Sequence, residues 1–509
     1  MAQPSPARST ASGSDFLQLR PASAPSKGLT SWLVNMLRAA IVDGRLAAGA
    51  PLPATRTLAG DLAISRGVVV EAYQRLAEEG LISARPGAGT TVQPLMRPTA
   101  APNSAPGLAT DQPRPTAGAS APLLPLPAPQ GLSGVEIDLS PGVPDLSAFP
   151  RAAWLRAERT VLDQAGATEL GYGDPRGAEP LRRELAGWLA RIRGIHTSPE
   201  DVIIVAGVAQ SLALLAQVLH ARGLTAIAVE DPGSRGAREE LAYWGLKPVP
   251  VAVDDQGLQV DELVRTGLSA ALLTPAHQFP TGVVLAPQRR RELLHWATAG
   301  GAERLVIEDD YDAEYRYDRA PVPALQASAP EHVAHTGSTS KTLAPGLRLG
   351  WLIPPRHLHA DLVAAKHASD LGNPALPQLV LAHLLASGEY DRHIRLMRTR
   401  QRSRRDALLA ALGEHLPHAR VQGVAAGLHL LITLPALPGL DDTHLAESIK
   451  QAGVLVHPLS WHRQRPGPPG LVLGYAAHPP DRLREVAGRI ADAVRTACHE
   501  PDAGAEASR

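Results

Sequence analysis

One lysine stands among hydroxyl and glycine residues of the types that suit covalent chemistry on a phosphorylated aldehyde. Residues 337–350 read GSTSKTLAPGLRLG, which places Lys341 between Ser338-Thr339-Ser340 and Arg348. A lysine amine forms a Schiff base with a carbonyl when its surroundings lower its pKa. Hydroxyls, glycine amides and a guanidinium are the donors that a phosphate dianion needs nearby. Taken alone, such a loop is more typical of a solvated turn, so the rest of the chain must support the chemistry.

Acidic and phenolic residues follow a short apolar run, about thirty residues before Lys341. Asp309 and Tyr311 have the types that an aromatic aldehyde with a pyridine nitrogen requires: a carboxylate keeps the ring nitrogen protonated, and a phenol adjusts the imine. The same run offers oxygens to a divalent metal ion, from Glu308, Asp309, Asp310, Asp312 and Glu314. We disfavour a metal site, because the lysine, glycine and arginine residues would then have no role. The scattered histidines, such as His357 and His359, are more typical of surface or core positions than of metal ligands.

Alternating strand and helix patterns from Ile137 onward indicate how these residues are brought together. Short apolar strands are expected at residues 202–205, 226–229, 270–273, 305–307, 333–334 and 349–353. Amphipathic helices are expected between them, as at residues 210–220, 235–244 and 287–299. Strands joined by such crossovers form a mainly parallel sheet covered on both faces, and ligands bind at the carboxyl ends of its strands. Lys341, Asp309 and the segment that begins at Gly207 would then share one cleft.

The N-terminal part of the chain contains three short helical patterns followed by a hairpin. We expect Thr30 or Ser31 to cap the first helix and Thr55 to cap the second. Ser65 opens the third helix, and residues 81–92, interrupted by PGAG, indicate a two-stranded wing. This order is the plan of a winged helix-turn-helix, whose third helix enters a major groove of DNA.

The third helix presents residues that suit contact with DNA. Its outward face opens with Ser65, Arg66, Gly67 and Val68, and the helix before it starts next to Arg56. Two arginines, a hydroxyl and the amides of a helix N-terminus can hold phosphates or read a guanine edge. Seven basic against five acidic side chains over residues 27–93 are only a modest excess. These patterns alone support a DNA reader and a structural three-helix unit about equally.

Residues 46–92 resemble the GntR-type DNA-binding domain along their whole length, and read LAAGAPLPATRTLAGDLAISRGVVVEAYQRLAEEGLISARPGAGTTV. The similarity includes the LPxxR turn, the Ser-Arg helix opening, the AYxxLxxxGL core and the GxGT wing. The resemblance implies a double-stranded DNA operator as partner, contacted by Arg56, Ser65, Arg66, Gly87, Gly89 and Thr90. Gly67 and Val68 replace the polar pair that this family usually carries, so base readout is expected to be narrower than in relatives.

Four motifs in the second part of the chain carry a further resemblance: GYGDPRG at 171–177, HQFPTG at 277–282, EDDYDAEYRYD at 308–318 and STSKTLAPGLRLGW at 338–351. They are similar to the fold-type I aminotransferase domain that binds pyridoxal 5'-phosphate (PLP), in the version fused behind a GntR-type reader in the MocR-like regulators. The resemblance covers most of residues 137–485. It implies a multidomain protein, in which a mainly α winged helix-turn-helix with a β wing precedes an α/β transferase domain with a mostly parallel sheet and large and small lobes.

The resemblance also implies roles for the residues of the cleft. Lys341 would carry the Schiff base to PLP, the internal aldimine. Asp309 would pair with the pyridine nitrogen, and Tyr311 would approach the ring hydroxyl. The phosphate would be held by Ser338, Ser340, Arg348 and the backbone of Gly207, Val208 and Ala209.

Three departures from the family pattern bear on function. Ser234 stands where a stacking tyrosine is common, and Val208 stands where a serine commonly follows Gly207. Residues 470–475 include no arginine, although related aminotransferases bind the substrate carboxylate with one at this place. The nearby alternatives are Arg235, Arg238, Arg463 and Arg465. Without such a guanidinium, an α-amino acid would lose a major part of its binding.

Composition and length set the domain plan. We expect a disordered tail at 1–25, the DNA-binding domain at 26–93, a Pro/Ala-rich linker at 94–134, the aminotransferase-like domain at 135–500 and a second tail at 501–509. Fifty basic side chains balance fifty acidic ones, so no overall charge points to nucleic acid or membrane. A single cysteine, Cys498, excludes an internal disulfide and fits a reducing cytoplasm. No apolar run reaches the roughly 18 residues of a membrane span.

Seven arginines gather between residues 392 and 405, on an expected helix that Asp391 opens. Four of them follow helical spacing and would form one basic stripe: Arg395, Arg398, Arg402 and Arg405. We favour a solvated face or a link between the two lobes over an additional DNA or dimer surface.

Together these features predict a cytoplasmic, homodimeric transcription regulator that depends on PLP. Its effector would be PLP itself or the aldimine of PLP with an amine or amino acid, and its target genes would serve vitamin B6 or amino-acid metabolism. Without a carboxylate clamp we expect at most partial transaminase chemistry and no efficient turnover. Two other functions stay open: a working aminotransferase with an accessory DNA-binding module, and a cofactor reservoir that recognises no specific DNA site.

Overall fold

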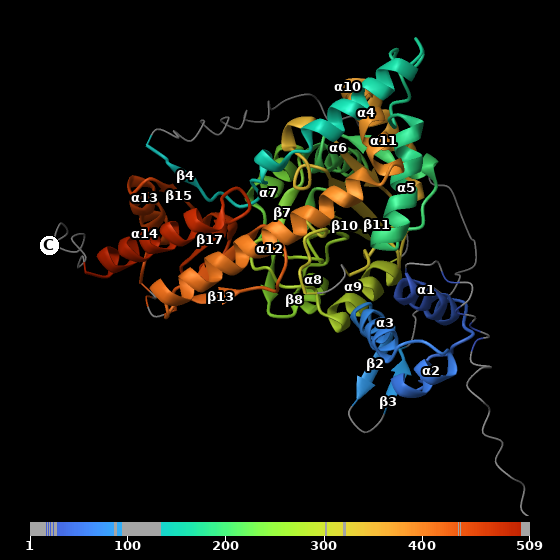
Figure 1. Cartoon of the computed structure of the whole chain (residues 1–509), viewed down its shortest axis with the longest axis horizontal. Coiled ribbons are helices and arrows are strands. Elements are labelled where there is room, and N and C mark those ends of the chain that lie inside the picture. The colour runs from blue at the N-terminus through green and yellow to red at the C-terminus, as the bar shows by residue number, and fades with distance from the viewer. Residues whose placement is uncertain are drawn as a thin grey trace, which may run out of the picture. The chain divides into compact units, whose positions relative to one another are not determined.

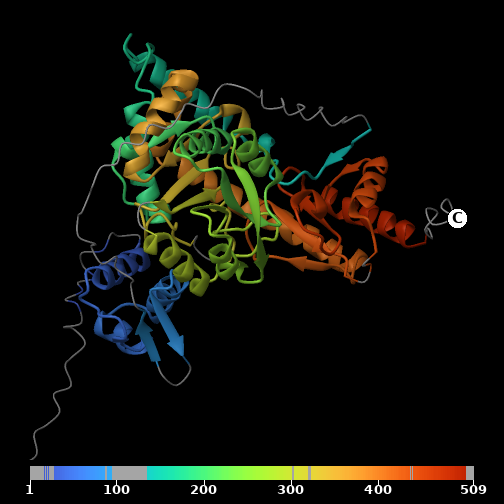
Figure 2. The same cartoon turned by 180° about the vertical axis from the view of Figure 1, so that it is seen from behind.

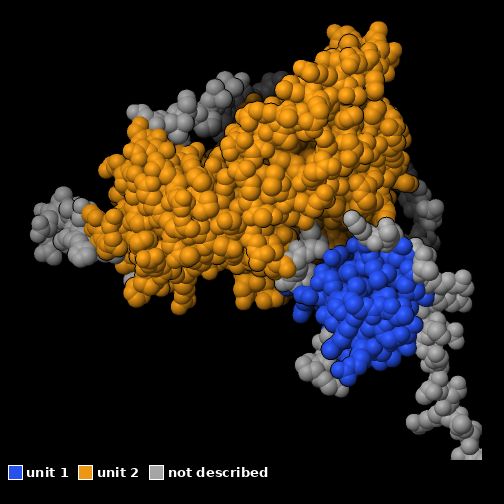
Figure 3. Space-filling view, in the orientation of Figure 1, with its two compact units in different colours: residues 1–103, 286–295 blue, residues 104–285, 296–509 orange. Residues whose placement is uncertain are grey.

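The computed structural model describes residues 28–85, 89–93, 134–300, 303–318, 322–435, 437 and 439–499, together with Leu17, Leu19, Pro21 and Ala24. The predicted tails and linker lie almost entirely outside these residues. The chain divides into two compact units, residues 1–103 with 286–295 and residues 104–285 with 296–509 (Figure 3). Helix α9 (Pro287–Ala299) therefore belongs partly to each unit.

The first unit contains a winged helix-turn-helix, as the sequence predicts. Its elements are α1 (Leu29–Val42), β1 (Pro51–Leu52), α2 (Thr55–Asp61), α3 (Arg66–Glu78), β2 (Ile82–Arg85) and β3 (Gly89–Val92). The strands form an antiparallel sheet in the order β1-β3-β2 (Figure 1). The predicted two-stranded wing thus gains a third strand from the loop that precedes α2.

Apolar side chains at helical spacing hold these three helices together. Leu33 of α1, Leu58 of α2 and Leu76 of α3 are fully buried in one core. The hydroxyl of Tyr73 donates a 2.8 Å hydrogen bond to the carbonyl oxygen of Pro53, just before α2. The core and this hydrogen bond together fix the third helix against the second.

Two of the predicted helix caps are wrong. Thr30 and Ser31 lie inside the first turn of α1, and Thr55 is the first residue of α2, so none of them is a cap. A capping residue precedes the helix and has non-helical backbone angles, whereas these residues are already helical. Ser65 does cap α3, since its Oγ accepts a 3.4 Å hydrogen bond from the amide of Val68.

An eight-stranded sheet is the centre of the second unit (Figures 1 and 2). The strands are β5 (Ile203–Val205), β6 (Ala226–Asp231), β7 (Lys247–Asp254), β8 (Gly257–Leu258), β9 (Ala270–Leu273), β10 (Leu305–Asp310), β11 (Val333–Ser338) and β12 (Gly350–Ile353). Their order is β5-β12-β11-β10-β9-β6-β7-β8. β12 is antiparallel to both neighbours and β8 to β7, whereas the other pairs are parallel. The predicted mostly parallel α/β sheet is confirmed.

Two strands escaped the sequence patterns, and one was placed too early. Pro248 and Pro250 lie within β7, and proline is rare inside strands because it lacks an amide hydrogen. The short β8 follows it directly. The strand expected from Leu349 begins at Gly350, after a 3-10 turn (Pro345–Leu347) and the left-handed Arg348 with a φ of 51°.

Helices cover both faces of the sheet because successive side chains of a strand point to opposite sides. Ile203 of β5 packs in a core with residues of α6 and α10, whereas Ile204 packs in a second core with residues of α4, α5 and α11. The helices of this lobe are α4 (Arg151–Gln164), α5 (Glu179–Arg193), α6 (Val208–Ala221), α7 (Arg235–Tyr243), α8 (Val260–Thr266), α9, α10 (Arg356–Asp370) and α11 (Ala375–Ala386).

The C-terminal elements, orange to red in Figure 1, form a smaller lobe around a third core. They are α12 (Glu389–His415), β13 (Arg420–Gln422), β14 (His429–Thr433), α13 (Asp442–Gln451), β15 (Val454–Leu455), β16 (His457–Pro458), β17 (Gly470–Gly474) and α14 (Pro480–His499). β15 pairs with β4 (Ile137–Asp138), so the segment that follows the predicted linker belongs to this lobe.

The predicted basic stripe of α12 is solvated in part. Arg395 and Arg402 are exposed, whereas Arg398 and Arg405 are half-buried. Arg398 donates a hydrogen bond to the carbonyl oxygen of Glu314, which supports the structural link that the sequence favoured. Arg404, outside the predicted stripe, forms a 2.8 Å ion pair with the buried Asp145. Separately, none of the helices in the described ranges combines the length and the apolar character needed to cross a bilayer.

Candidate functional site

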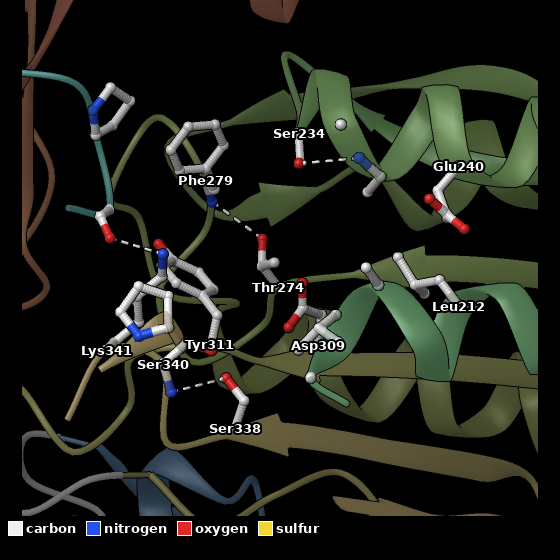
Figure 4. A pocket seen from close by; sticks show the side chains of 18 of the residues that line it. Leu212, Ser234, Glu240, Thr274, Phe279, Asp309, Tyr311, Ser338, Ser340 and Lys341 are labelled. Atoms are coloured by element: carbon white, nitrogen blue, oxygen red, sulfur yellow. Dashed lines mark hydrogen bonds between the residues drawn. The ribbon is translucent and has the colours of Figure 1, made fainter. Parts of the chain in front are cut away.

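A cavity of about 530 Å³ opens beside the carboxyl ends of β9, β10 and β11. Every residue predicted to bind the cofactor lines it: Lys341, Asp309, Tyr311, Ser338, Ser340, Arg348, Gly207, Val208 and Ala209. Figure 4 shows Lys341, Tyr311 and Asp309 around the same space, although Lys341 follows β11 and the other two lie at the end of β10. The sheet therefore brings together residues that lie up to about 140 positions apart in the sequence.

Lys341 reaches the cavity from the loop between β11 and β12. Its Nζ donates a 2.7 Å hydrogen bond to the carbonyl oxygen of Gly142, and its own carbonyl oxygen accepts one of 3.0 Å from Tyr315. Burial lowers the pKa of the Lys341 amine, although the carboxylates of Asp312 and Asp309 act in the opposite direction. A lowered pKa makes the amine a better nucleophile at neutral pH, as a Schiff base requires.

Asp309 presents an unpaired carboxylate oxygen. Its Oδ1 is buried and, within the described part of the chain, has no hydrogen-bond partner. Burial, together with the neighbouring carboxylates of Asp310 and Asp312, raises the pKa of Asp309 to about 8. Buried acceptors rarely stay unpaired in folded proteins, so a cationic N–H group of a ligand would complete this site. The arrangement fits a protonated pyridine nitrogen.

The other acids of β10 point to the opposite face and have their own partners. Asp310 forms a 2.6 Å ion pair with the buried Arg193, and Glu308 accepts a 2.7 Å hydrogen bond from the amide of Leu325. Side chains alternate along a strand, which is why Asp309 alone of these three enters the cavity. Glu308, Asp309 and Asp310 therefore do not gather into the oxygen cluster that a divalent ion would need, whereas Asp312 of the same run lies close to His277 and His429.

The phosphate-binding residues surround the N-terminus of α6. Gly207 precedes this helix with a φ of 91°, a left-handed conformation that favours glycine, and a Cβ there would lie 3.5 Å from the guanidinium nitrogens of Arg348. The first amides of α6, which begins at Val208, have no acceptor within the helix and suit an anion. The Oγ of Ser338 accepts a 3.3 Å hydrogen bond from the amide of Ser340, which orders the loop on the other side.

Tyr311 meets two buried side chains that the sequence reasoning did not assign to the site. Its hydroxyl lies 3.0 Å from Nδ1 of His277, and that nitrogen lies 2.9 Å from Oδ2 of Asp312. His429 packs beside His277 with ring centroids 5.2 Å apart, and its Nε2 lies 3.1 Å from the carbonyl oxygen of Pro280. The only signal in the sequence was the position of His277 at the start of the HQFPTG motif.

The DNA-binding face lies on the other unit and agrees with the sequence in part. Arg66 and Gly67 are exposed at the start of α3. Val68 is half-buried and packs against the core, so its side chain is not on the outward face as predicted. Val70, 42% exposed, and Gln74 continue that face instead. Their spacing of four residues from Arg66 is the signal that could have identified them.

Other predicted DNA contacts are accessible as well. Arg56 is exposed in the first turn of α2, and Ser65 is exposed although its hydroxyl caps α3. Gly89, with a φ of 81°, and Thr90 begin the second strand of the wing. Gly87 lies outside the described residues. These positions stay predictions, because each is defined by accessibility and not by a bound partner.

Comparison with known proteins places both parts of the chain. Residues 29–92 match the family of bacterial regulatory proteins, gntR family, and residues 135–490 match aminotransferase class I and II. The chain is 34% identical to the HTH-type pyridoxine biosynthesis transcriptional regulator PdxR of Corynebacterium glutamicum, over 91% of this chain and 95% of that protein. It is 31% identical to the probable rhizopine catabolism regulatory protein MocR of Rhizobium meliloti, over 89% of this chain and 91% of that protein.

The chain belongs to the MocR-like transcription regulators. A crystal structure of LysN, the α-aminoadipate aminotransferase of Thermus thermophilus, matches the second part with a TM-score of 0.65 at 26% identity. The match covers 72% of this chain and 94% of LysN. The GntR domain binds DNA and the aminotransferase-like domain binds PLP, as predicted.

This MocR-like regulator replaces the stacking tyrosine with a residue that serves the fold. The Oγ of Ser234 accepts a 3.2 Å hydrogen bond from the amide of Ala237 and so caps α7. Phe279 and His429 are the rings that line the cavity besides Tyr311. An aromatic face for the cofactor is therefore available from another part of the chain.

The carboxylate clamp is missing in the structure of this MocR-like regulator as well. Among the described residues that line the cavity, Arg348 is the only arginine. The arginines named as alternatives are engaged elsewhere: Arg235 pairs with Glu239 at 2.6 Å, Arg465 with Glu262 at 2.6 Å, and Arg238 and Arg463 donate to backbone carbonyl oxygens. Arg348 lies beside Gly207, where the sequence predicts a phosphate contact.

Replacing Asp309 tests whether its carboxylate is kept for a ring nitrogen. A folded-state pKa raised from 3.8 to about 8 means that, in PLP-free protein, the contribution of Asp309 to stability is lost as pH rises through this interval. Asp309→Asn should therefore have the same free energy of unfolding as the wild type near pH 4 and a larger one at about pH 8. The difference should grow by up to about 1.4 kcal/mol for each pH unit between these values. The PLP affinity of Asp309→Asn should fall about tenfold or more.

Urea denaturation at several pH values, followed by tryptophan fluorescence, measures the first effect, and PLP titration measures the second. Asp255→Asn is the matched control, since Asp255 is exposed in the turn between β7 and β8. An unchanged PLP affinity in Asp309→Asn would contradict the assignment.

Proposed function

We propose that this protein is a PLP-responsive transcription regulator, in which bound PLP, or its adduct with an amine, changes how the DNA-binding domain engages an operator. The observation that carries the proposal is a cavity with a lysine, a carboxylate and phosphate donors for PLP, in which no described arginine of the lining is left for a substrate carboxylate. Such a site favours holding the cofactor over turning over amino acids. Similarity to a pyridoxine biosynthesis regulator supports vitamin B6 genes as targets. The protein would bind their operators in the cytoplasm.

A contact of Lys341 suggests how the cofactor would be sensed. Its hydrogen bond to Gly142 joins the cavity to the segment that leads back through β4 to the predicted linker. Formation of a Schiff base uses the Lys341 amine, so the protein with and without PLP would differ at this contact. A ligand shifts a conformational equilibrium only through interactions that differ between the two states, and this hydrogen bond is one of them.

Lys341→Ala should abolish the effect of PLP on operator binding while leaving binding without PLP intact, because the first depends on covalent capture and the second on the GntR domain. Footprinting on the DNA upstream of the protein's own gene, with and without PLP, measures both. Lys247→Ala is the control, since Lys247 is exposed on β7 and does not line the cavity.

A PLP response that survives in Lys341→Ala would overturn the proposal. Multiple-turnover transamination with an amino-acid donor, together with DNA binding that ignores PLP, would instead favour a working aminotransferase. Tight PLP binding without any specific DNA site would favour a cofactor reservoir.

Arg66→Ala should weaken DNA binding, because Arg66 is exposed at the N-terminus of α3. A phosphate contact predicts a uniform loss across sequences and a salt slope smaller by about one, whereas a base contact predicts a loss of about 1–3 kcal/mol at one position of the operator. Fluorescence anisotropy at several salt concentrations separates the two. Arg45→Ala is the control on a loop of the same unit, and equal behaviour of both variants would contradict the predicted recognition helix.

We also propose a homodimer that buries one side of α4 and the loop after it. Leu155 and Leu162 lie two turns apart on α4 and are 55% and 50% exposed, and Tyr172 in the following loop is 94% exposed. Exposed apolar residues grouped in this way mark interaction surfaces. Sedimentation should show a dimer in the wild type and a monomer after Leu155→Glu with Leu162→Glu. Leu396→Glu, which changes an equally exposed leucine of α12, should leave the dimer intact. A monomeric wild type would refute this part.

A further inference from the structure

Behind Tyr311 lies a pair of buried polar side chains whose role is not explained by holding the phosphate or the ring nitrogen. His277 is 3% exposed and Asp312 is 2% exposed. The His277 Nδ1 lies 2.9 and 3.2 Å from the two carboxylate oxygens of Asp312 and 3.0 Å from the Tyr311 hydroxyl. A buried pair of this kind, directed at a residue of the cavity, can control that residue without touching a ligand.

We propose that His277, held by Asp312, is a positioning residue that fixes the Tyr311 hydroxyl for the ring oxygen of PLP. The inference rests on the PLP binding that belongs to the proposed function, and it assigns His277 no contact with the cofactor. Its effect passes through Tyr311, which lines the cavity, whereas His277 does not.

The protein leaves His277 little freedom to move. Gly427 has a φ of 75°, and a Cβ at this position would lie only 2.0 Å from Cε1 of His277. The ring of His429 also packs against His277, with centroids 5.2 Å apart and the rings tilted by 46°. A glycine is therefore required where the imidazole approaches the backbone, and a second ring restricts the imidazole further.

The hydrogen bonds also decide which atom carries the proton. An ionised carboxylate only accepts hydrogen bonds, so Nδ1 of His277 must donate to Asp312. Because Nδ1 then carries the proton, it cannot accept a hydrogen bond from Tyr311. The phenolic oxygen of Tyr311 can only accept a second hydrogen bond from the same N–H group. The Tyr311 O–H is thereby left to donate to Asp312 or to an oxygen in the cavity.

Charged groups around Tyr311 keep its proton in place. Burial raises the pKa of Tyr311 well above its ordinary value, and the carboxylates of Asp312, Asp309 and Glu230 act in the same direction. Lys341 and Arg348 are the lysine and arginine side chains among the described residues that line the cavity. Burial also lowers the pKa of His429, so that its ring adds no positive charge at neutral pH. Tyr311 is therefore a hydrogen-bond donor at neutral pH, and its direction is what His277 and Asp312 control.

Two amide variants separate the positioning role from simple space filling. The side-chain amide of His277→Asn lies close to the place of Nδ1, whereas that of His277→Gln reaches the place of Nε2. Both variants are polar and of similar size. The readout is the midpoint of a pH titration of the absorbance of bound PLP, measured on the full-length protein.

His277→Gln should raise this midpoint by about one unit or more, the equivalent of one lost hydrogen bond to a charged oxygen. The direction is upward because a ring oxygen without its donor, and an Asp312 carboxylate without its partner, both favour the protonated form of the cofactor. His277→Asn should return the midpoint toward the wild-type value. In a Tyr311→Phe background, His277→Gln should have a clearly smaller effect.

Equal shifts with and without Tyr311, or a wild-type midpoint in His277→Gln, would overturn the positioning role. A wild-type titration that changes on addition of EDTA would also overturn it, since a metal ion and not a hydrogen bond would then join His277, Asp312 and His429. Absence of the PLP absorbance in the wild type would instead contradict the proposed function, so the two failures can be told apart.

Discussion

The burial of one unpaired carboxylate is the constraint on which the second unit depends. Asp309 lies on the same strand as Glu308 and Asp310, but these two face the opposite side and are satisfied by Arg193, backbone amides and His335. The strand therefore carries one acid whose partner must come from outside. A buried carboxylate with a pKa of about 8 is a latent cost of folding, and a cationic ring nitrogen removes that cost when it binds.

A second contact joins the cavity to another segment of the chain. The Lys341 amine donates a hydrogen bond to the carbonyl oxygen of Gly142, and Gly142 follows strand β4, which pairs with β15 of the C-terminal lobe. In the proposed function, covalent capture of an aldehyde would use this amine and so remove its contact with the segment next to the predicted linker. Coupling is reciprocal, so if capture of the cofactor changes DNA binding through this segment, DNA binding would change the affinity for the cofactor by the same factor.

The sequence was sufficient to predict the site residues that lie at the carboxyl ends of strands. Asp309 and Gly207 stand next to apolar runs and Ser338 is the last residue of β11, and parallel strands bring such positions to one edge. The contact between Tyr311 and His277 could not be predicted, because it depends on two loops and on a glycine at position 427 that leaves room for the ring. β7 was missed because its two prolines disfavour a strand when the sequence is considered locally. Pairing with the neighbouring strands β6 and β8 overcomes this local preference.

The donors around the cavity bear on selectivity in the proposed function. In that proposal the phosphate would be held by Arg348, two serine hydroxyls and the amides of α6, the ring nitrogen by Asp309 and the aldehyde by Lys341, all of which line the cavity. A free amino acid could react only at the same carbonyl, because no described arginine of the lining is left for its carboxylate. Most of the specific binding energy would therefore be available to PLP and little to an amino acid. A protein with this division of contacts would respond chiefly to the amount of cofactor, as a regulator of cofactor supply requires.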